Sequence, residues 1–272
     1  MKILGVIIIG LLVLSIMYVF MVAPRMFDKP DRSPFLGIHY AHRGLFDNQS
    51  DVPENSIRAF AKAVEAGYGM EMDVQLSKDK VPVVFHDATL KRMCGVEGKV
   101  WEYTLAELQK MRLMGTDQTI PTFAEVLETI GGKTPIIVEY KMDIPDVNVC
   151  KLGDSLLQKY TGVYCIESFH PFAVRWYKKH RPEILRGQLS KNFLKDQKYR
   201  KNPFCWFQTN LLFNFLGRPD FIAYKHKDAA QISRRLCRKL GSLSVAWTIK
   251  SPEEHENVKK DFDLFIFDSC RL

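Results

Sequence analysis

Several common patterns are missing from this 272-residue sequence. Its six cysteines form no C-x-x-C pair, which argues against a zinc site or a dithiol redox site, so we expect reduced, mostly buried thiols. The sequence has no internal repeat of solenoid period and no low-complexity tract. The formal net charge is +8, but no dense Lys/Arg run with interleaved aromatic residues is evident, and we expect no nucleic-acid binding. The length fits one large domain or two small ones.

One long apolar run is present near the start of the chain. Residues 3–23, ILGVIIIGLLVLSIMYVFMVA, carry no charge. This length matches the ~20 helical residues that cross a bilayer. A cleaved signal peptide would have a shorter apolar core and small residues at its end, whereas MVAPRM is a poor cleavage site. We therefore expect residues 1–23 to be the transmembrane anchor of a single-pass membrane protein.

Charges on either side of this run bear on its orientation. Lys2 precedes the run, and Arg25, Lys29 and Arg32 follow it. The positive-inside rule leans toward a cytoplasmic domain, although the N-terminal tail is too short to decide the side. Residues 24–36 contain prolines and charged side chains and are expected to be a linker.

Apolar, β-rich runs alternate with helical patterns after residue 36. The runs are 37–43, 69–76, 82–86, 135–141, 163–169, 184–189, 220–224, 243–248 and 263–267. Only five residues separate the second run from the third, whereas a parallel crossover needs about a dozen or more. The third run must therefore return as a β-hairpin. The other eight predict an α/β fold, a (β/α)₈ TIM barrel over residues 37–272, with its chemistry at the C-terminal ends of the strands.

The second of these runs, YGMEMDVQL, carries two acids on one face. Glu71 and Asp73 are two residues apart and point to the same side of a strand, and apolar residues occupy the other side. Two close carboxylates in a barrel mouth repel each other, and a hard divalent cation would relieve that repulsion. The alternative is an exposed edge strand with harmless acids, but its regular apolar alternation favours a covered strand and a metal site.

A later run, PIIVEYK, repeats this arrangement. Glu139 and Lys141 share one face, so Glu139 is a candidate third metal ligand and Lys141 a candidate anchor for an anion. A Glu–Lys ion pair inside the barrel is the alternative interpretation.

Two histidines end predicted strands. His42 lies in AHRG and His86 in VVFHD, and such residues beside carboxylates suit general acid–base catalysis. Arg43 offers a planar fork for a phosphate group. The other five histidines lack such neighbours, although His170 in ESFHP also follows a strand.

The order of these motifs makes a family resemblance specific. AHRG, PENS, EMDV, VVFHD, VEYK, ESF and AWT occur in the order seen in the glycerophosphodiester phosphodiesterase family of phospholipase-C-like TIM barrels. The resemblance covers roughly residues 38–268. It implies the following roles: His42 and His86 as catalytic residues, Glu71, Asp73 and Glu139 as ligands of Mg²⁺ or Ca²⁺, Arg43 and Lys141 as phosphate contacts, Glu54 and Asn55 as supports of the site, and Trp247 as a pocket wall.

The sequence also departs from that family. The family's closing Thr-Asp-x-Pro is replaced by FIFDSC, which keeps only Asp268, and the usual Thr of PENT is Ser56. Residues 87–119 resemble an insertion that overhangs the pocket, and residues 190–219 and 225–241 match no pattern. Trp247 could equally be a core residue of the barrel.

The resemblance implies metal-assisted hydrolysis of a glycerophosphodiester to glycerol 3-phosphate and an alcohol. The expected membrane anchor makes a lysophospholipase-D-like activity on lysophospholipids an open alternative. A lyase that stops at a cyclic phosphate is another. A non-catalytic, membrane-anchored phosphodiester-binding protein is the alternative from a different class, although no proposed catalytic group is missing here.

Overall fold

Eight parallel strands form a closed barrel in the computed structural model, which describes residues 2–142 and 145–272. The strands follow one another around the ring in the order β1, β2, β4, β5, β6, β7, β8 and β9, and β9 pairs with β1 to close it. Their bounds are β1 (His39–His42), β2 (Gly69–Leu76), β4 (Ile136–Tyr140), β5 (Tyr164–Ser168), β6 (Arg186–Ser190), β7 (Phe221–Lys225), β8 (Leu243–Ile249) and β9 (Leu264–Phe267). The predicted TIM barrel is confirmed.

The ninth strand lies outside this ring. β3 (Pro82–Val84) pairs with β2 in antiparallel orientation, with Val84 opposite Val74 and Pro82 opposite Leu76. The short connection between the two strands allows only this return. The β-hairpin predicted from the spacing is therefore confirmed, and it places His86 just beyond the end of β3.

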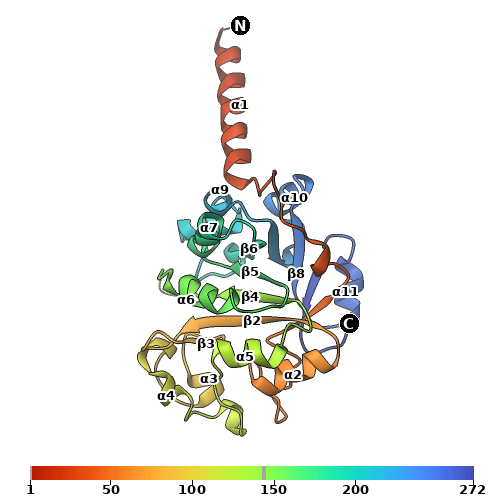
Figure 1. Cartoon of the computed structure of the whole chain (residues 1–272). Coiled ribbons are helices and arrows are strands. Elements are labelled where there is room, and N and C mark those ends of the chain that lie inside the picture. The colour runs from red at the N-terminus through yellow and green to blue at the C-terminus, as the bar shows by residue number, and fades with distance from the viewer. Residues whose placement is uncertain (1, 143–144) are drawn as a thin grey trace.

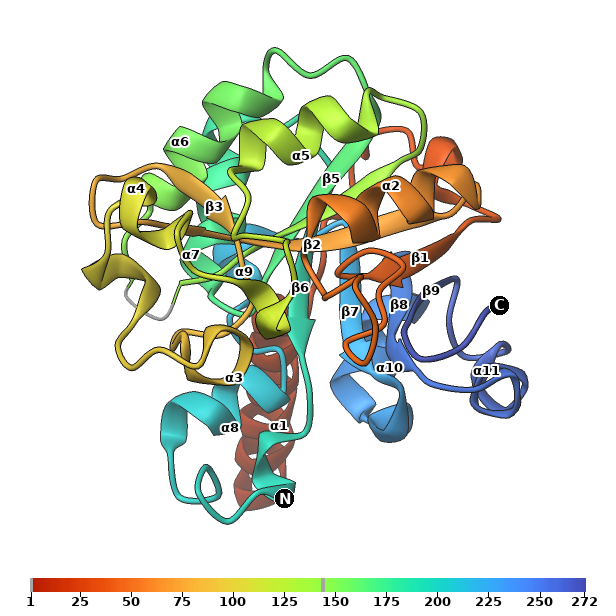
Figure 2. The same cartoon turned by 90° about the horizontal axis from the view of Figure 1, so that it is seen from below.

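Helices surround the barrel (Figures 1 and 2). Their bounds are α2 (Ile57–Glu65), α3 (Lys91–Cys94), α4 (Leu105–Leu108), α5 (Phe123–Ile130), α6 (Asn148–Leu157), α7 (Pro171–His180), α8 (Pro203–Thr209), α9 (Asn214–Gly217), α10 (Ile232–Lys239) and α11 (Pro252–Val258). Ser56 is the N-cap of α2 and accepts a hydrogen bond from the Ala59 N–H at 3.1 Å. The C-cap is Ala66, and Gly67 follows in the left-handed region with φ of 73°.

Apolar side chains fill two layers of the domain. Met70, Met72 and Val74 of β2 are fully buried and pack in the layer between the strands and the helices. Tyr40 and Ile137 belong to a second cluster inside the barrel. The side chains of β2 thus alternate as its sequence predicts, and its acids share the inner face.

The segment 24–36, which its composition predicts to be a linker, packs against the barrel. Phe35 is 4% exposed and joins the inner cluster, and its carbonyl accepts a hydrogen bond from the Tyr40 hydroxyl at 3.0 Å. Arg25 donates to the Pro182 carbonyl at 2.7 Å, and Lys29 donates to the Gly241 carbonyl at 2.7 Å. Arg25 and Lys29, two of the charges used to predict the orientation of the anchor, are therefore hydrogen-bonded to the domain.

Helix α1 (Lys2–Val22) projects away from the domain (Figure 1). Residues Ile3–Val22 have a mean hydropathy of 2.9 and are long and apolar enough to cross a membrane; most of them are exposed, whereas Val22 is buried against the domain. The end of α1 is attached to the region of α9. Asn214 donates to the Val22 carbonyl at 2.7 Å, and Arg218 donates to the carbonyls of Phe20 and Ala23, both at 2.8 Å.

Candidate active site

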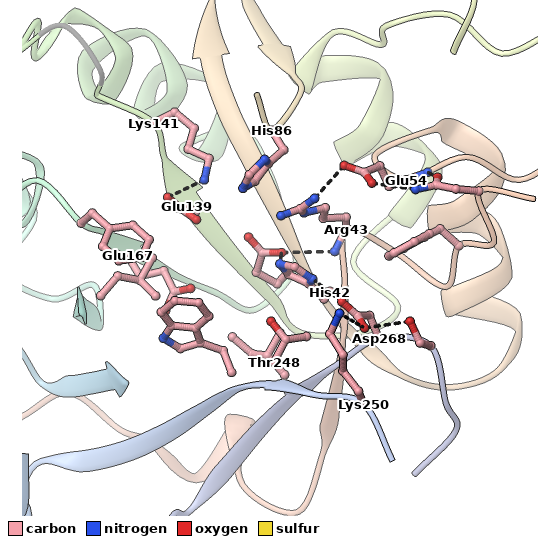
Figure 3. Close-up of a pocket in the computed structure, with 18 residues that line it drawn as sticks. His42, Arg43, Glu54, His86, Glu139, Lys141, Glu167, Thr248, Lys250 and Asp268 are labelled. Atoms are coloured by element: carbon pink, nitrogen blue, oxygen red, sulfur yellow. Dashed lines mark hydrogen bonds and ion pairs between the residues drawn. The ribbon is translucent and has the colours of Figure 1, made fainter. Parts of the chain in front are cut away.

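A cavity of about 450 Å³ opens where the barrel strands end (Figure 3). Eight of the ten residues predicted for the site line it: His42, Arg43, Glu54, Glu71, His86, Glu139, Lys141 and Trp247. The other two lie just behind this lining, where the Asn55 amide donates to Asp73 Oδ2 at 2.9 Å. Residues spread over more than 200 positions of sequence therefore meet at one end of the barrel.

Three carboxylates form the base of this cavity. Asp73 of β2 lies directly beside Glu139 of β4 in the strand register, and Glu71 lies two residues earlier on the same face. One oxygen from each lies within 4.8 Å of the others, and all three residues are buried. Burial, followed by the charges of Asp73 and Glu139, raises the pKa of Glu71 well above its ordinary value. A compact set of buried oxygen donors of this kind could bind a hard divalent metal ion.

Two cations lie beside the carboxylates. Lys141 Nζ lies 2.9 Å from Glu139 Oε1 and 3.0 Å from Asp73 Oδ1, and Arg43 Nε lies 3.4 Å from Asp73 Oδ2. The side chains of both cations point into the cavity (Figure 3). The ion pair between Lys141 and Glu139, one interpretation of their spacing, is present, and both residues still face the site.

A sharp turn after β1 orients Arg43. Its φ of 58° is unusual for a residue with a side chain, and its backbone N–H donates to Glu71 Oε2 at 3.2 Å. Gly44 follows with φ of 80°, and a Cβ there would lie 2.8 Å from the backbone carbon of Ala59. The HRG sequence thus needs its glycine for both conformation and space.

His42 faces two acids at the cavity wall. Its Nδ1 lies 3.2 Å from Asp268 Oδ2, and its Nε2 lies 3.9 Å from Glu71 Oε2. Burial and the charge of Arg43 lower the pKa of His42 to about 4, although Asp268 acts in the opposite direction. The imidazole is therefore neutral near pH 7 and can accept a proton.

His86 lies across the cavity from His42 (Figure 3). Its Nδ1 lies 2.6 Å from Asp87 Oδ1, and its side chain is about a third exposed. Each histidine thus has a carboxylate partner on Nδ1, which leaves Nε2 for contact with a reacting group. Sequence reasoning noted Asp268 only as the remnant of a motif and did not single out Asp87, although Asp87 is adjacent to His86.

Glu54 links Arg43 to the segment 87–119, the insertion. Its Oε1 accepts hydrogen bonds from Arg43 Nη1 and Arg92 Nη2, both at 2.7 Å, and its Oε2 accepts from Arg92 Nη1 at 2.9 Å. Arg92 also donates to Asp87 Oδ2 at 2.6 Å. One side chain from α3 therefore connects the supports of Arg43 and of His86. No spacing signal in the sequence distinguishes Arg92 from the other arginines.

The far wall of the cavity holds a further acid and an aromatic pair. Glu167 of β5 is 1% exposed, and its Oε2 has no hydrogen-bond partner among the residues that the structure describes. Trp247 packs edge-to-face on Phe169 with ring centroids 5.6 Å apart, and both line the cavity. The motif ESF contains Glu167 and Phe169, but its sequence alone assigns neither of them a place in the site.

TIM-barrel enzymes have their active sites at the carboxyl ends of the barrel strands. The acids, histidines and cations described above are gathered at this end. The model of the glycerophosphoryl diester phosphodiesterase family matches residues 42–261. The chain belongs to this family, and it is an enzyme, a phosphoric diester hydrolase.

Three similar proteins illustrate the relationship. A glycerophosphodiester phosphodiesterase of Caldanaerobacter subterraneus subsp. tengcongensis is 30% identical over 81% of this chain and 88% of its own. The lysophospholipase D GDPD1 of Rattus norvegicus is 33% identical over 44% of this chain and 41% of its own. A phosphodiesterase of Oleispira antarctica, solved with its product sn-glycerol-3-phosphate, superposes with a TM-score of 0.70 over 86% of this chain and 94% of its own, at 24% identity.

Proposed function

We propose that the protein hydrolyses glycerophosphodiesters to glycerol 3-phosphate and an alcohol. The observation that carries this proposal is the convergence of three carboxylates, two cations and two histidines on one cavity. The relative from Caldanaerobacter is named for the same activity, which supports the proposal. A cavity of about 450 Å³ suits a small diester.

Glu71, Asp73 and Glu139 would hold Mg²⁺ or Ca²⁺. Their oxygen-only donor set fits either ion, and both are cations that prefer such ligands. A bound divalent ion would supply a Lewis acid that polarises a phosphoryl oxygen. Arg43 and Lys141 would contact the remaining phosphate oxygens, because both cations lie beside the carboxylates and face the cavity.

His42 and His86 would transfer the protons of the reaction. One histidine would take the proton of the attacking hydroxyl as the new P–O bond forms. The other would give a proton to the alcohol oxygen as the P–O bond to the leaving group breaks. By family analogy the attacker is the neighbouring glycerol hydroxyl, in which case a cyclic phosphate forms first and water opens it. Either assignment of acid and base agrees with the geometry. Glu54 and Asn55 would hold Arg43 and Asp73 in place, and Trp247 would form a pocket wall.

A second candidate substrate is a lysophospholipid. Its phosphodiester group is the same, and two features of the chain favour it, namely the exposed apolar helix α1 and a second cavity beside the first. We propose that residues 1–23 anchor the protein in a membrane, that residues 24–36 connect the anchor to the barrel, and that residues 37–272 form the catalytic domain. The flanking charges lean toward a cytoplasmic domain.

Product analysis tests this function directly. The full-length protein in detergent is incubated with glycerophosphocholine, glycerophosphoethanolamine or lysophosphatidylcholine, and ³¹P NMR follows the products. We expect glycerol 3-phosphate, or its acylated form from the lipid. A cyclic phosphate that never opens would identify a lyase instead. Binding of the diesters with no turnover, unaffected by EDTA, would identify a binding protein.

A further inference from the structure

The segment between β6 and α9, for which the sequence predicts no pattern, has an unusual surface. Residues 191–207, KNFLKDQKYRKNPFCWF, carry five basic side chains and one acidic one. Two large aromatic side chains of α8 face solvent, with Phe204 40% exposed and Trp206 48% exposed. Lys198, Arg200 and Lys201 are exposed as well. Exposed aromatics beside cations are typical of surfaces that bind an anionic membrane interface.

This segment lies on the same side of the barrel as α1. Helix α9 contacts α1 and begins five residues after α8 ends. Figure 1 shows α9 at the base of α1, whereas α4 lies on the opposite side of the barrel. Because the end of α1 is hydrogen-bonded to Asn214 and Arg218, the anchor fixes which flank of the domain faces the bilayer.

Aromatic rings extend from the anchor toward the mouth of the barrel. Phe20 of α1 lies 6.2 Å from Phe215 of α9, between ring centroids. Phe213, two residues earlier, lies 5.1 Å from Phe204 of α8, and Phe204 lies 6.2 Å from His170 at the carboxyl end of β5. Two sets of aromatic contacts, linked by the chain at residues 213–215, thus lie between α1 and the rim of the site.

A second cavity reaches from the catalytic groups to this rim. It has a volume of about 620 Å³ and shares His86, Lys141 and Phe169 with the first cavity. Phe204 and Gln208 of α8 form its outer wall. A diester whose phosphate lies at Lys141 could therefore extend its apolar part toward α8.

We propose that residues 191–207 form a membrane-docking lip, which lies on the anionic bilayer that holds α1 and opens the second cavity toward lipid. The cations meet anionic headgroups, and Trp206 enters the interface between headgroups and acyl chains. The lip would give a lysophospholipid a path from the bilayer to the site. This inference rests on the proposed function and on the proposed anchor.

Tryptophan quenching by brominated lipid tests the position of the lip. The full-length protein is placed in nanodiscs of phosphatidylcholine and phosphatidylglycerol, with or without brominated acyl chains. We expect brominated lipid to quench the tryptophan fluorescence of the wild-type protein. The loss of fluorescence should be much smaller in Trp206→Phe, which keeps the other three tryptophans. Equal quenching in both proteins, or none in either, would overturn the proposal. This readout needs no turnover, so it stands even if the proposed function fails.

Kinetics on a lipid and on a soluble substrate test whether the lip helps a lysophospholipid reach the site. Two variants are compared with the wild-type protein: Trp206→Ser, and the triple variant Lys198→Gln/Arg200→Gln/Lys201→Gln. Each should raise KM for lysophosphatidylcholine in anionic nanodiscs roughly tenfold. Turnover of soluble glycerophosphocholine should stay at the wild-type level. Val163→Ser, an exposed apolar site at the amino end of β5, is the control. Equal losses on both substrates, or no loss on the lipid, would contradict the lip. Failure of the wild-type protein on both substrates would instead contradict the proposed function.

Discussion

At the scale of single residues, the two histidines carry the most specific expectation. His42→Ala and His86→Ala should each lower kcat on glycerophosphocholine by about 10²–10⁴-fold, because each removes one proton-transfer group. Their melting temperatures should stay near that of the wild-type protein, since neither histidine belongs to an apolar core cluster. His180→Ala, on the exposed end of α7, is the matched control. Near-wild-type turnover by either variant would exclude that histidine from catalysis.

The pKa of Glu54 predicts how its contribution to stability depends on pH. Burial alone would raise its pKa, but hydrogen bonds from Arg92 and the charge of Arg43 outweigh burial and lower the pKa to about 2. Because the folded pKa lies below the ordinary value of 4.5, this stabilisation is present above that pH and is lost as the pH falls toward 2. Glu54→Gln should therefore cost on the order of 2–3 kcal/mol at neutral pH and roughly half of that or less near pH 3.

Thermal unfolding in detergent at the two pH values measures this difference. Glu97→Gln is a suitable control, because Glu97 is exposed and its carboxylate pairs with the exposed Lys91. A penalty for Glu54→Gln that is equally large at both pH values would show that the carboxylate charge does not matter.

At the scale of elements, the short helix α3 connects two parts of the site. This four-residue helix supplies Arg92, which holds both Glu54 and Asp87. The satellite core under the insertion, which includes Phe85, Met93 and Val100, keeps α3 in place. The insertion therefore ties together the supports of Arg43 and His86.

Arg92→Gln tests this connection. We expect kcat/KM on glycerophosphocholine to fall about 10–100-fold, because partners of catalytic groups have effects of this size. Arg112→Gln should behave like the wild-type protein, because the side chain of Arg112, in the same insertion, donates to the exposed Asp117 carbonyl. A change confined to thermal stability, with wild-type kinetics in the folded protein, would argue against a positioning role.

At the scale of the whole molecule, strand spacing was enough to predict the barrel. The hairpin followed from one short connection, and the alternation in YGMEMDVQL placed Glu71 and Asp73 on the inner face. Those predictions depend on local periodicity, which a single sequence records. Arg92 and Glu167 could not be assigned in this way, because their places depend on contacts between segments far apart in the chain.

Two surface features also escaped prediction. The segment 24–36 has the composition of a linker, but its prolines and charges do not reveal that Phe35 enters the barrel. Residues 191–207 show no periodicity, and only the position of α1 and α9 gives their exposed aromatics a context.

We propose that the carboxylates of β2 and β4 hold a divalent cation on which hydrolysis depends. The direct measurement is release of glycerol 3-phosphate from glycerophosphocholine by EDTA-treated protein, before and after Mg²⁺ or Ca²⁺ is returned. We expect that chelation abolishes release, that one of the two ions restores it, and that Asp73→Asn stays inactive with either ion. Undiminished release after complete removal of divalent metal would contradict it.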